Sequence, residues 1–125
     1  MIEFDIPGNP VGQGRPRFAR RGSYVTAYDP PKSRSYKALV AMCCQHAYSG
    51  EPIKGPIRVT VHAYFEIPKS YSKKRTAACI EGRELPTKKA DIDNIIKGIF
   101  DAMNGLAYTD DKNIIEVKAV KQYSH

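Results

Sequence analysis

The sequence predicts an α+β domain in which a small mixed β-sheet packs with helices. Residues 57–67 alternate apolar and polar side chains, the pattern of a strand with one buried face. Residues 92–103 place isoleucine, phenylalanine and methionine along one helical stripe. The chain has 125 residues, of which 42% are hydrophobic, so we expect one globular domain over residues 1–125.

The N-terminal part predicts two short strands separated by a loop. Residues 2–6 alternate isoleucine and phenylalanine with acids, which indicates a strand with one buried face. Residues 7–23 are rich in glycine and proline, which favours a loop. Residues 24–28 have strand-forming side chains, and we expect an edge strand there.

Three helices and a last strand follow. Pro30 and Pro31 favour the start of a helix that stops near Gly50. Residues 70–81 predict a short basic helix that ends at Gly82. The strongest helix covers 91–104, with Gly105 at the left-handed position that closes it. Residues 115–120 alternate again and predict the final strand.

Composition limits the partners and the compartment. Lys and Arg number 20 against 13 Asp and Glu, and the net charge of +7 favours a polyanionic partner. The apolar runs are too short to span a membrane, and charged Glu3 and Asp5 follow Met1 directly, so we expect no secretion signal. The three cysteines, two of them adjacent, are typical of a reduced, cytoplasmic protein.

The chain has an acidic cluster in an otherwise basic sequence. Asp93, Lys97 and Asp101 lie on the helix face opposite the isoleucine stripe, and Asp91 stands at the helix start. Asp110 and Asp111 form a second acidic pair before the last strand. Carboxylates are the ligands that Mg²⁺ prefers, and a basic surface binds the DNA backbone. This combination is expected of a metal-dependent nuclease.

Purely structural roles are an alternative explanation for the same acidic residues. Asp91 or Asp93 has the residue type of a helix cap, Asp93 and Lys97 have the spacing of a helical ion pair, and Asp110 with Asp111 suits a turn. Other sites are excluded. The sequence lacks the residues of a calcium-binding EF-hand loop, the spacing of a nucleotide-binding glycine loop and the spacing of a zinc site, so we expect no nucleotide cofactor.

The basic loops are candidate phosphate-binding segments, because arginine binds phosphate through two parallel hydrogen bonds. The candidate DNA-binding residues are Arg15, Arg17, Arg20, Arg21, Lys73, Lys74, Arg75, Lys88 and Lys89. Six tyrosines are suited to stacking on bases, although each is individually expected to be structural: Tyr24, Tyr28, Tyr36, Tyr64, Tyr71 and Tyr108.

The acidic segment also carries a resemblance. The runs Asp91-Ile-Asp-Asn-Ile-Ile-Lys97, Phe100-Asp-Ala-Met-Asn-Gly105 and Tyr108-Thr-Asp-Asp111 resemble the RusA family of Holliday junction resolvases. The loop 14–18, the strand 55–68 and the basic stretch after it are similar to the same family, so the likeness covers nearly the whole chain. Members are small crossover junction endodeoxyribonucleases, often encoded by prophages.

The resemblance implies a RusA-like α+β fold and a Mg²⁺-dependent homodimer, with Mn²⁺ as a possible substitute. The dimer would nick two opposed strands of a four-way DNA junction, in recombination and repair. The family's essential acids match Asp91, Asp93 and Asp111, its essential lysine matches Lys97, and Asp110 is a weaker candidate metal ligand.

The sequence departs from the family pattern in two places. Ala90 stands where many members have proline, which we expect to be harmless. The sequence ends at His125, where many relatives continue into another strand. Two other functions remain open from the sequence: a nuclease for other branched DNA such as forks or flaps, and a non-catalytic phage DNA-binding module.

Overall fold

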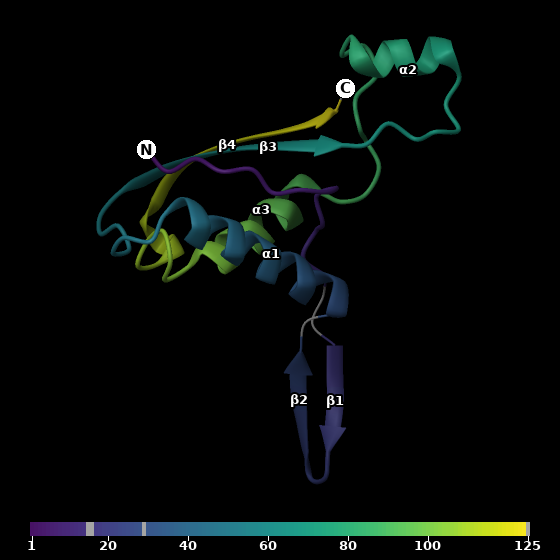
Figure 1. Cartoon of the computed structure of the whole chain (residues 1–125). Helices are drawn as coiled ribbons and strands as arrows, with labels where there is room; N and C mark the ends of the chain where they lie inside the picture. The colour runs from purple at the N-terminus through teal and green to yellow at the C-terminus, as the bar shows by residue number, and fades with distance from the viewer. Residues whose placement is uncertain (15–16, 29, 125) are drawn as a thin grey trace.

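The structure, a computed structural model, confirms the α+β class. It describes residues 1–14, 17–28 and 30–124, without the side chain of Arg21. In chain order the elements are β1 (Arg17–Arg21), β2 (Tyr24–Tyr28), α1 (Pro31–Ala47), β3 (Ile57–Phe65), α2 (Lys73–Ile80), α3 (Ile92–Met103), the 3-10 turn η1 (Asp111–Asn113) and β4 (Ile114–Tyr123) (Figure 1).

The strands form two separate sheets. In the body of the molecule, β3 and β4 pair in parallel, from Arg58 opposite Glu116 to Phe65 opposite Tyr123. The chain between these strands carries α2 and α3, because parallel neighbours need a long crossover. β1 and β2 pair with each other in an antiparallel hairpin. The prediction of a single mixed sheet was therefore wrong for the described residues.

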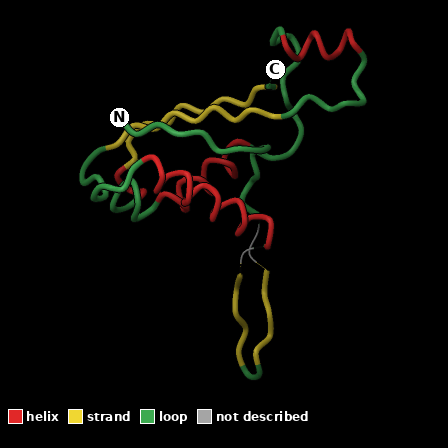
Figure 2. The backbone as a smooth tube through the Cα atoms, in the orientation of Figure 1, coloured by secondary structure: helices red, strands yellow, loops and turns green. Residues whose placement is uncertain are grey.

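The core lies between the β3–β4 sheet and a layer made by α1 and α3. Figures 1 and 2 show both helices on the same side of the sheet. One buried cluster joins Tyr36 and Val40 of α1, Ala63 of β3, and Ile95 and Ile99 of α3. A second cluster, of Cys44, Ala107 and Tyr108, extends it beyond the end of α3.

The three helices begin and end close to the residues that the sequence predicts. α1 has Pro31 in its first turn and ends before Tyr48. α2 begins after Ser72, whose hydroxyl accepts a hydrogen bond from the Arg75 amide at 3.2 Å. Gly105 has φ +80°, the left-handed conformation predicted after α3.

Two predictions near the N-terminus were wrong. Residues 2–6 pair with no strand in the described part of the chain; Phe4 and Ile6 pack against the core, so the alternation reflects one-sided burial without pairing. Residues 17–21, expected in a loop, form β1. Gly22, with φ +62°, is the first of the two residues that join β1 to β2, where a tight hairpin turn requires a positive φ.

Two further observations concern the cysteines and the helices. Cys43, Cys44 and Cys79 carry free thiols. In residues 1–14, 17–28 and 30–124, none of the helices combines the length and hydropathy needed to cross a membrane.

Candidate active site

The predicted acidic face lies on α3. Ile95 and Ile99 are buried against α1 and β3, whereas Asp93, Lys97 and Asp101 are exposed on the opposite side of the helix. The isoleucine stripe therefore sets which side of α3 faces the core, and the 3.6-residue period places the three charged residues on the outside.

The carboxylates at the start of α3 make neither the capping hydrogen bond nor the helical ion pair that ordinary structure predicts for them. Asp91 is the N-cap residue of α3, yet its side chain makes no capping hydrogen bond. Asp93 and Lys97 have the spacing of an ion pair, but no N–O distance within 4.0 Å joins them among the described residues. Both carboxylates are exposed at the positive end of the helix dipole, where they are accessible to a ligand from outside the chain.

Asp101, at the other end of α3, has a structural partner. Its carboxylate lies 3.6 Å from the Lys37 ammonium of α1, and this ion pair ties the two helices together. Asp101 lies eight positions after Asp93, which corresponds to about 12 Å along the helix axis.

Asp110 and Asp111 behave as a coupled turn pair. The Asp110 carboxylate accepts a hydrogen bond from the Lys112 amide at 3.0 Å, and this bond lowers the pKa of Asp110. The hydrogen bond with the Asp110 side chain raises the pKa of Asp111, with further contributions from burial and from the charges of Asp110 and Asp101. Asp111 therefore lies near the end of α3 that carries Asp101.

The predicted metal ligands consequently form two groups. Asp91 and Asp93 lie at the start of α3, and Asp110 and Asp111 lie near its end. Over residues 1–14, 17–28 and 30–124, no three His, Cys, Asp or Glu side chains come together in a group able to hold a metal ion. Within one chain, the structure does not bring Asp111 to Asp91 and Asp93.

A basic hollow of about 630 Å³ lies beside the start of α3. Its cationic side chains are Arg17 from β1, Lys32 from α1 and Lys89, which precedes Asp91 by two residues. Lys32 was absent from the predicted DNA-binding residues. The signal for it was the unfavourable basic charge at the start of α1, which opposes the helix dipole.

Close backbone packing holds the hollow together. The Gln13 amide donates to the Asn94 carbonyl at 3.0 Å, which ties the loop before the hairpin to α3. The Gly14 amide donates to the buried Ser33 hydroxyl at 2.9 Å, which ties the same loop to α1. A Cβ atom on Gly12 would lie 2.7 Å from the Ala90 Cβ, so this approach requires glycine.

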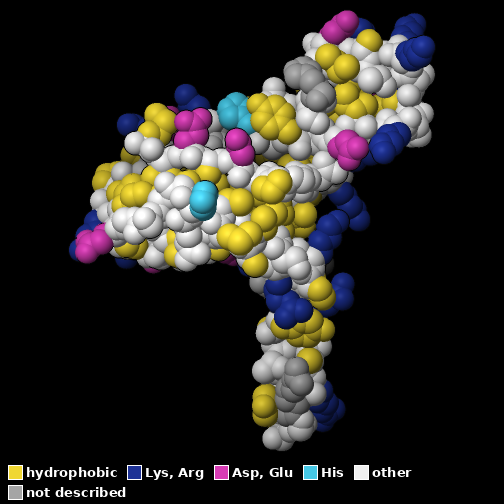
Figure 3. All heavy atoms as spheres, in the orientation of Figure 1, with side chains coloured by type: hydrophobic (Ala, Val, Ile, Leu, Met, Phe, Trp, Pro, Cys, Tyr) yellow, Lys and Arg dark blue, Asp and Glu magenta, His cyan; other side chains and the backbone are white. Residues whose placement is uncertain are grey.

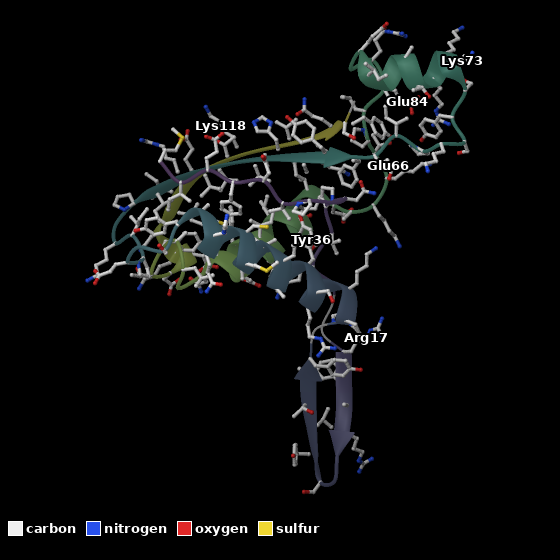
Figure 4. All side chains as sticks on the ribbon, viewed as in Figure 1. Arg17, Tyr36, Glu66, Lys73, Glu84 and Lys118 are labelled. Atoms are coloured by element: carbon white, nitrogen blue, oxygen red, sulfur yellow. The ribbon has the colours of Figure 1, made fainter. Side chains whose placement is uncertain are left out.

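The other predicted DNA-binding residues lie on both sides of this hollow. Figure 3 shows Lys and Arg side chains along the side of the molecule from α2 to the hairpin, and Figure 4 shows Lys73 and Arg17 near the two ends. Arg20, Lys73, Lys74, Lys88 and Lys89 are exposed. Arg15 and the Arg21 side chain lie outside the described residues.

Arg75 already has partners within the chain. Its guanidinium lies 3.6 Å from the centre of the Tyr71 ring, and its Nε donates to the Glu84 carboxylate at 2.9 Å, which raises the Arg75 pKa. Arg75 is exposed, but a phosphate would have to compete with Glu84 for its guanidinium.

The predicted tyrosines divide into buried and exposed residues, except Tyr71, which is half-buried beneath Arg75. Tyr36 and Tyr108 are buried in the core, as the structural interpretation expects. Tyr108 donates a hydrogen bond to the Phe100 carbonyl at 2.7 Å near the end of α3, and burial raises its pKa. Tyr24, Tyr28 and Tyr64 are exposed.

Comparisons with known proteins identify the family of the chain. The chain is 40% identical over 125 residues to "Uncharacterized protein YqaN" of Bacillus subtilis (strain 168), an alignment that covers 98% of this chain and 88% of that protein. No solved structure matches the chain. The sequence model of a family described as "Endodeoxyribonuclease RusA" matches residues 7–125. The chain therefore belongs to the RusA endodeoxyribonuclease family.

Proposed function

We propose that this protein is a Mg²⁺-dependent endodeoxyribonuclease that resolves Holliday junctions by paired nicks in opposed strands. The observation that supports it most is the pair of exposed carboxylates at the start of α3. Asp91 is the N-cap residue of α3 but makes no side-chain capping hydrogen bond, and Asp93 has no ion-pair partner in the described chain. Both lie next to a hollow with three cationic side chains, in a chain of an endodeoxyribonuclease family.

The donor set at the start of α3 suits magnesium. Mg²⁺ in enzymes on phosphate substrates is commonly bound through one or two carboxylates, with water and substrate oxygens completing the shell. Asp91 and Asp93 would supply those carboxylates, and Mn²⁺ accepts the same oxygen donors. When bound, the metal ion neutralises phosphate charge and lowers the pKa of a water. Asp111, with Asp110 beside it, remains a proposed ligand through the family resemblance.

The remaining residues of the site act on the DNA. Lys97 is exposed one turn after Asp93, where its ammonium would stabilise the charge that develops on the scissile phosphate. Arg17, Lys32 and Lys89 would hold backbone phosphates next to that position. Lys73 and Lys74 would contact a more distant part of the backbone.

A homodimer fits the paired cleavage. Two opposed strands of a four-way junction are related by an approximate twofold axis, and a twofold-symmetric dimer presents two equivalent sites. Each copy would cut one strand, and we propose that cleavage requires the dimer.

The experiment is cleavage of a synthetic four-way junction by the purified protein, with Mg²⁺ and with EDTA. We expect symmetric nicks only with Mg²⁺ and only in the junction, with a linear duplex of the same sequence left intact. Asp91→Asn should lose cleavage and keep junction binding, since it removes a ligand charge and no phosphate contact. The matched control is Asp5→Asn, an exposed aspartate outside the candidate site.

The same experiment separates the other functions. Faster cleavage of forks or flaps than of the four-way junction would identify a nuclease for other branched DNA. Tight junction binding without cleavage in either Mg²⁺ or Mn²⁺ would indicate a non-catalytic DNA-binding module. Cleavage by Asp91→Asn at the wild-type rate would refute the assignment of Asp91.

A further inference from the structure

The β1–β2 hairpin exposes aromatic side chains that the fold does not use. Every residue of β2 is exposed, and the hairpin extends away from the body of the molecule (Figure 1). Phe18, Tyr24 and Tyr28 have exposed fractions of 71%, 62% and 40%, whereas the core residue Tyr108 has 1%. None of these three rings belongs to either hydrophobic cluster of the described chain.

Burial of these rings against another molecule would be favourable, because aromatic side chains carry large apolar surfaces. Such a cluster on one exposed element is typical of a binding surface. The hairpin itself is held by backbone pairing and by the Thr26 hydroxyl, which donates to the Ala19 carbonyl at 3.3 Å. The rings are therefore available to a partner without a loss of packing in the body.

The charge of the hairpin favours DNA as that partner. Residues 17–28 contain three arginines and no carboxylate. The register places Phe18 opposite Ala27 and Arg20 opposite Val25, so one face of the hairpin carries both a ring and a cation. On the other face, Arg17 lies opposite Tyr28 and Arg21 lies opposite Tyr24. Neither face is continuously apolar, whereas the core of a protein–protein interface excludes most charges. Single-stranded or unstacked DNA needs both groups, cations for phosphates and rings for bases.

The hairpin begins at the candidate active site. Arg17, its first residue, lines the hollow together with Lys89, two residues before Asp91. Phe18 follows Arg17 directly, and Tyr24 lies about 14 Å farther along the hairpin than Tyr28, from the rise of a strand. A DNA backbone held at the hollow would therefore present its neighbouring bases to the hairpin.

We propose that the β1–β2 hairpin is a base-stacking arm that recognises the branch point of the junction. Phe18 on one face of the hairpin and Tyr24 on the other stack on bases whose own stacking is interrupted at the branch, and Arg20 and Arg17, one on each face, hold the flanking phosphates. In linear duplex the bases stay stacked on each other, so the rings find no base to stack on and only the arginines of the hairpin contact the DNA, through its phosphates. This inference rests on the proposed function and gives it a physical basis for selecting branched over linear DNA.

The test is the affinity of each variant for a four-way junction and for linear duplex, measured in EDTA so that no DNA is cut. Phe18→Ala and Tyr24→Ala should each weaken junction binding about tenfold, the size of one base–aromatic stack, and duplex binding less than about threefold. Tyr24→Phe keeps the ring and should bind like wild type. Phe18→Leu keeps apolar volume without a ring and should behave like Phe18→Ala. Tyr64→Ala, which removes an exposed tyrosine of β3, is the matched control and should bind both DNAs normally.

A second readout reports the contact itself. 5-Iodouracil placed at the branch point should photocrosslink to the tryptic peptide 22–32, which contains Tyr24 and Tyr28, and the same base inside a duplex arm should not. Failure of wild-type protein to cleave the junction in Mg²⁺ would refute the proposed function while leaving these binding measurements valid.

Three results would overturn the inference. Equal losses on junction and duplex would show that the hairpin provides only general DNA affinity. Normal junction binding by Phe18→Leu would show that apolar volume, and not ring stacking, is what matters. A loss of the homodimer in Phe18→Ala or Tyr24→Ala, measured by sedimentation equilibrium, would show that the hairpin binds a second copy of the chain.

Discussion

Replacement of Lys97 by alanine distinguishes a catalytic lysine from a helix-surface lysine. Lys97 is exposed on α3, and no ion pair within 4.0 Å joins it to Asp93 in the described chain. An exposed lysine at this spacing contributes about 0.3–0.5 kcal/mol to stability even when its pair forms. We therefore expect the melting temperature of Lys97→Ala to stay within about 2 °C of wild type.

The expected effect on cleavage is much larger. If the Lys97 ammonium stabilises charge on the scissile phosphate, its removal should slow cleavage about a hundredfold or more. The assay is single-turnover cleavage of a four-way junction at saturating protein, beside thermal melting of the same preparations. Lys97→Arg keeps the charge but changes its reach, so we expect only partial recovery.

A charge-matched control removes the remaining ambiguity. Lys118 is exposed on β4, outside the candidate active site, and Lys118→Ala lowers the net charge of the chain by the same amount (Figure 4). This variant should cleave at nearly the wild-type rate. If Lys97→Ala cleaves within a few-fold of Lys118→Ala, Lys97 is a surface residue and the catalytic assignment is refuted.

Three further predictions concern DNA binding and stability. The double variant Arg17→Ala/Arg20→Ala should reduce the slope of log affinity against log salt by about 0.9 per lost phosphate contact, and an unchanged slope would place the DNA elsewhere. Tyr108→Phe leaves the Phe100 carbonyl without its donor, so it should lower the free energy of unfolding by about 1 kcal/mol and the melting temperature by about 4 °C; calorimetry that shows no change would contradict this role. Burial raises the pKa of Tyr36 and Tyr108, and raises that of Tyr123 to about 12. Their contribution to stability is complete below about pH 10, the pKa of unfolded tyrosine, and is lost as the pH rises toward 12, so urea unfolding should show a falling free energy over that interval.

The elements that contact the core were predictable from the sequence. α1, α3 and β3 each turn one face to the core, and burial imposes a period of 3.6 or 2 on their apolar residues. β4 reaches the core at Ile114 but leaves Ile115 and Val117 exposed, so its alternating sequence identifies a strand without a buried apolar face. The alternation of apolar and polar residues wrongly predicted a strand at residues 2–6, because alternation indicates which side chains are buried and not whether the backbone pairs with another strand.

Of the two hairpin strands, the sequence predicted β2 and missed β1, for a related reason. β1 has no buried face, so its sequence Arg-Phe-Ala-Arg-Arg lacks a hydrophobic period. The available signal was local: Gly22 and Ser23 are a residue pair typical of a two-residue hairpin turn, and residues 24–28 were already predicted as a strand. A strand on the other side of that turn follows from the turn chemistry alone.

The acidic face of α3 was predictable, whereas the basic hollow was not. Helical spacing is enough to place Asp93 and Lys97 opposite the isoleucine stripe. The hollow combines Arg17, Lys32 and Lys89 from three distant segments, and only tertiary packing brings these together. The separation of Asp111 from Asp91 likewise depends on how the chain returns after α3.

The position of the carboxylates relative to the hollow is set by small, uncharged residues. Gly98 of α3 faces Gln13, and Gly12 lies against Ala90, one residue before Asp91. These contacts and the hydrogen bond from Gln13 to Asn94 fix the loop that leads into the hairpin onto the start of α3. Mutual repulsion would otherwise drive the cationic side chains of the hollow apart, whereas the helix dipole favours the carboxylates at the start of α3. The isoleucine stripe, the two glycines and the hairpin are therefore parts of one arrangement, in which core packing holds carboxylates, cations and exposed rings within reach of the same DNA.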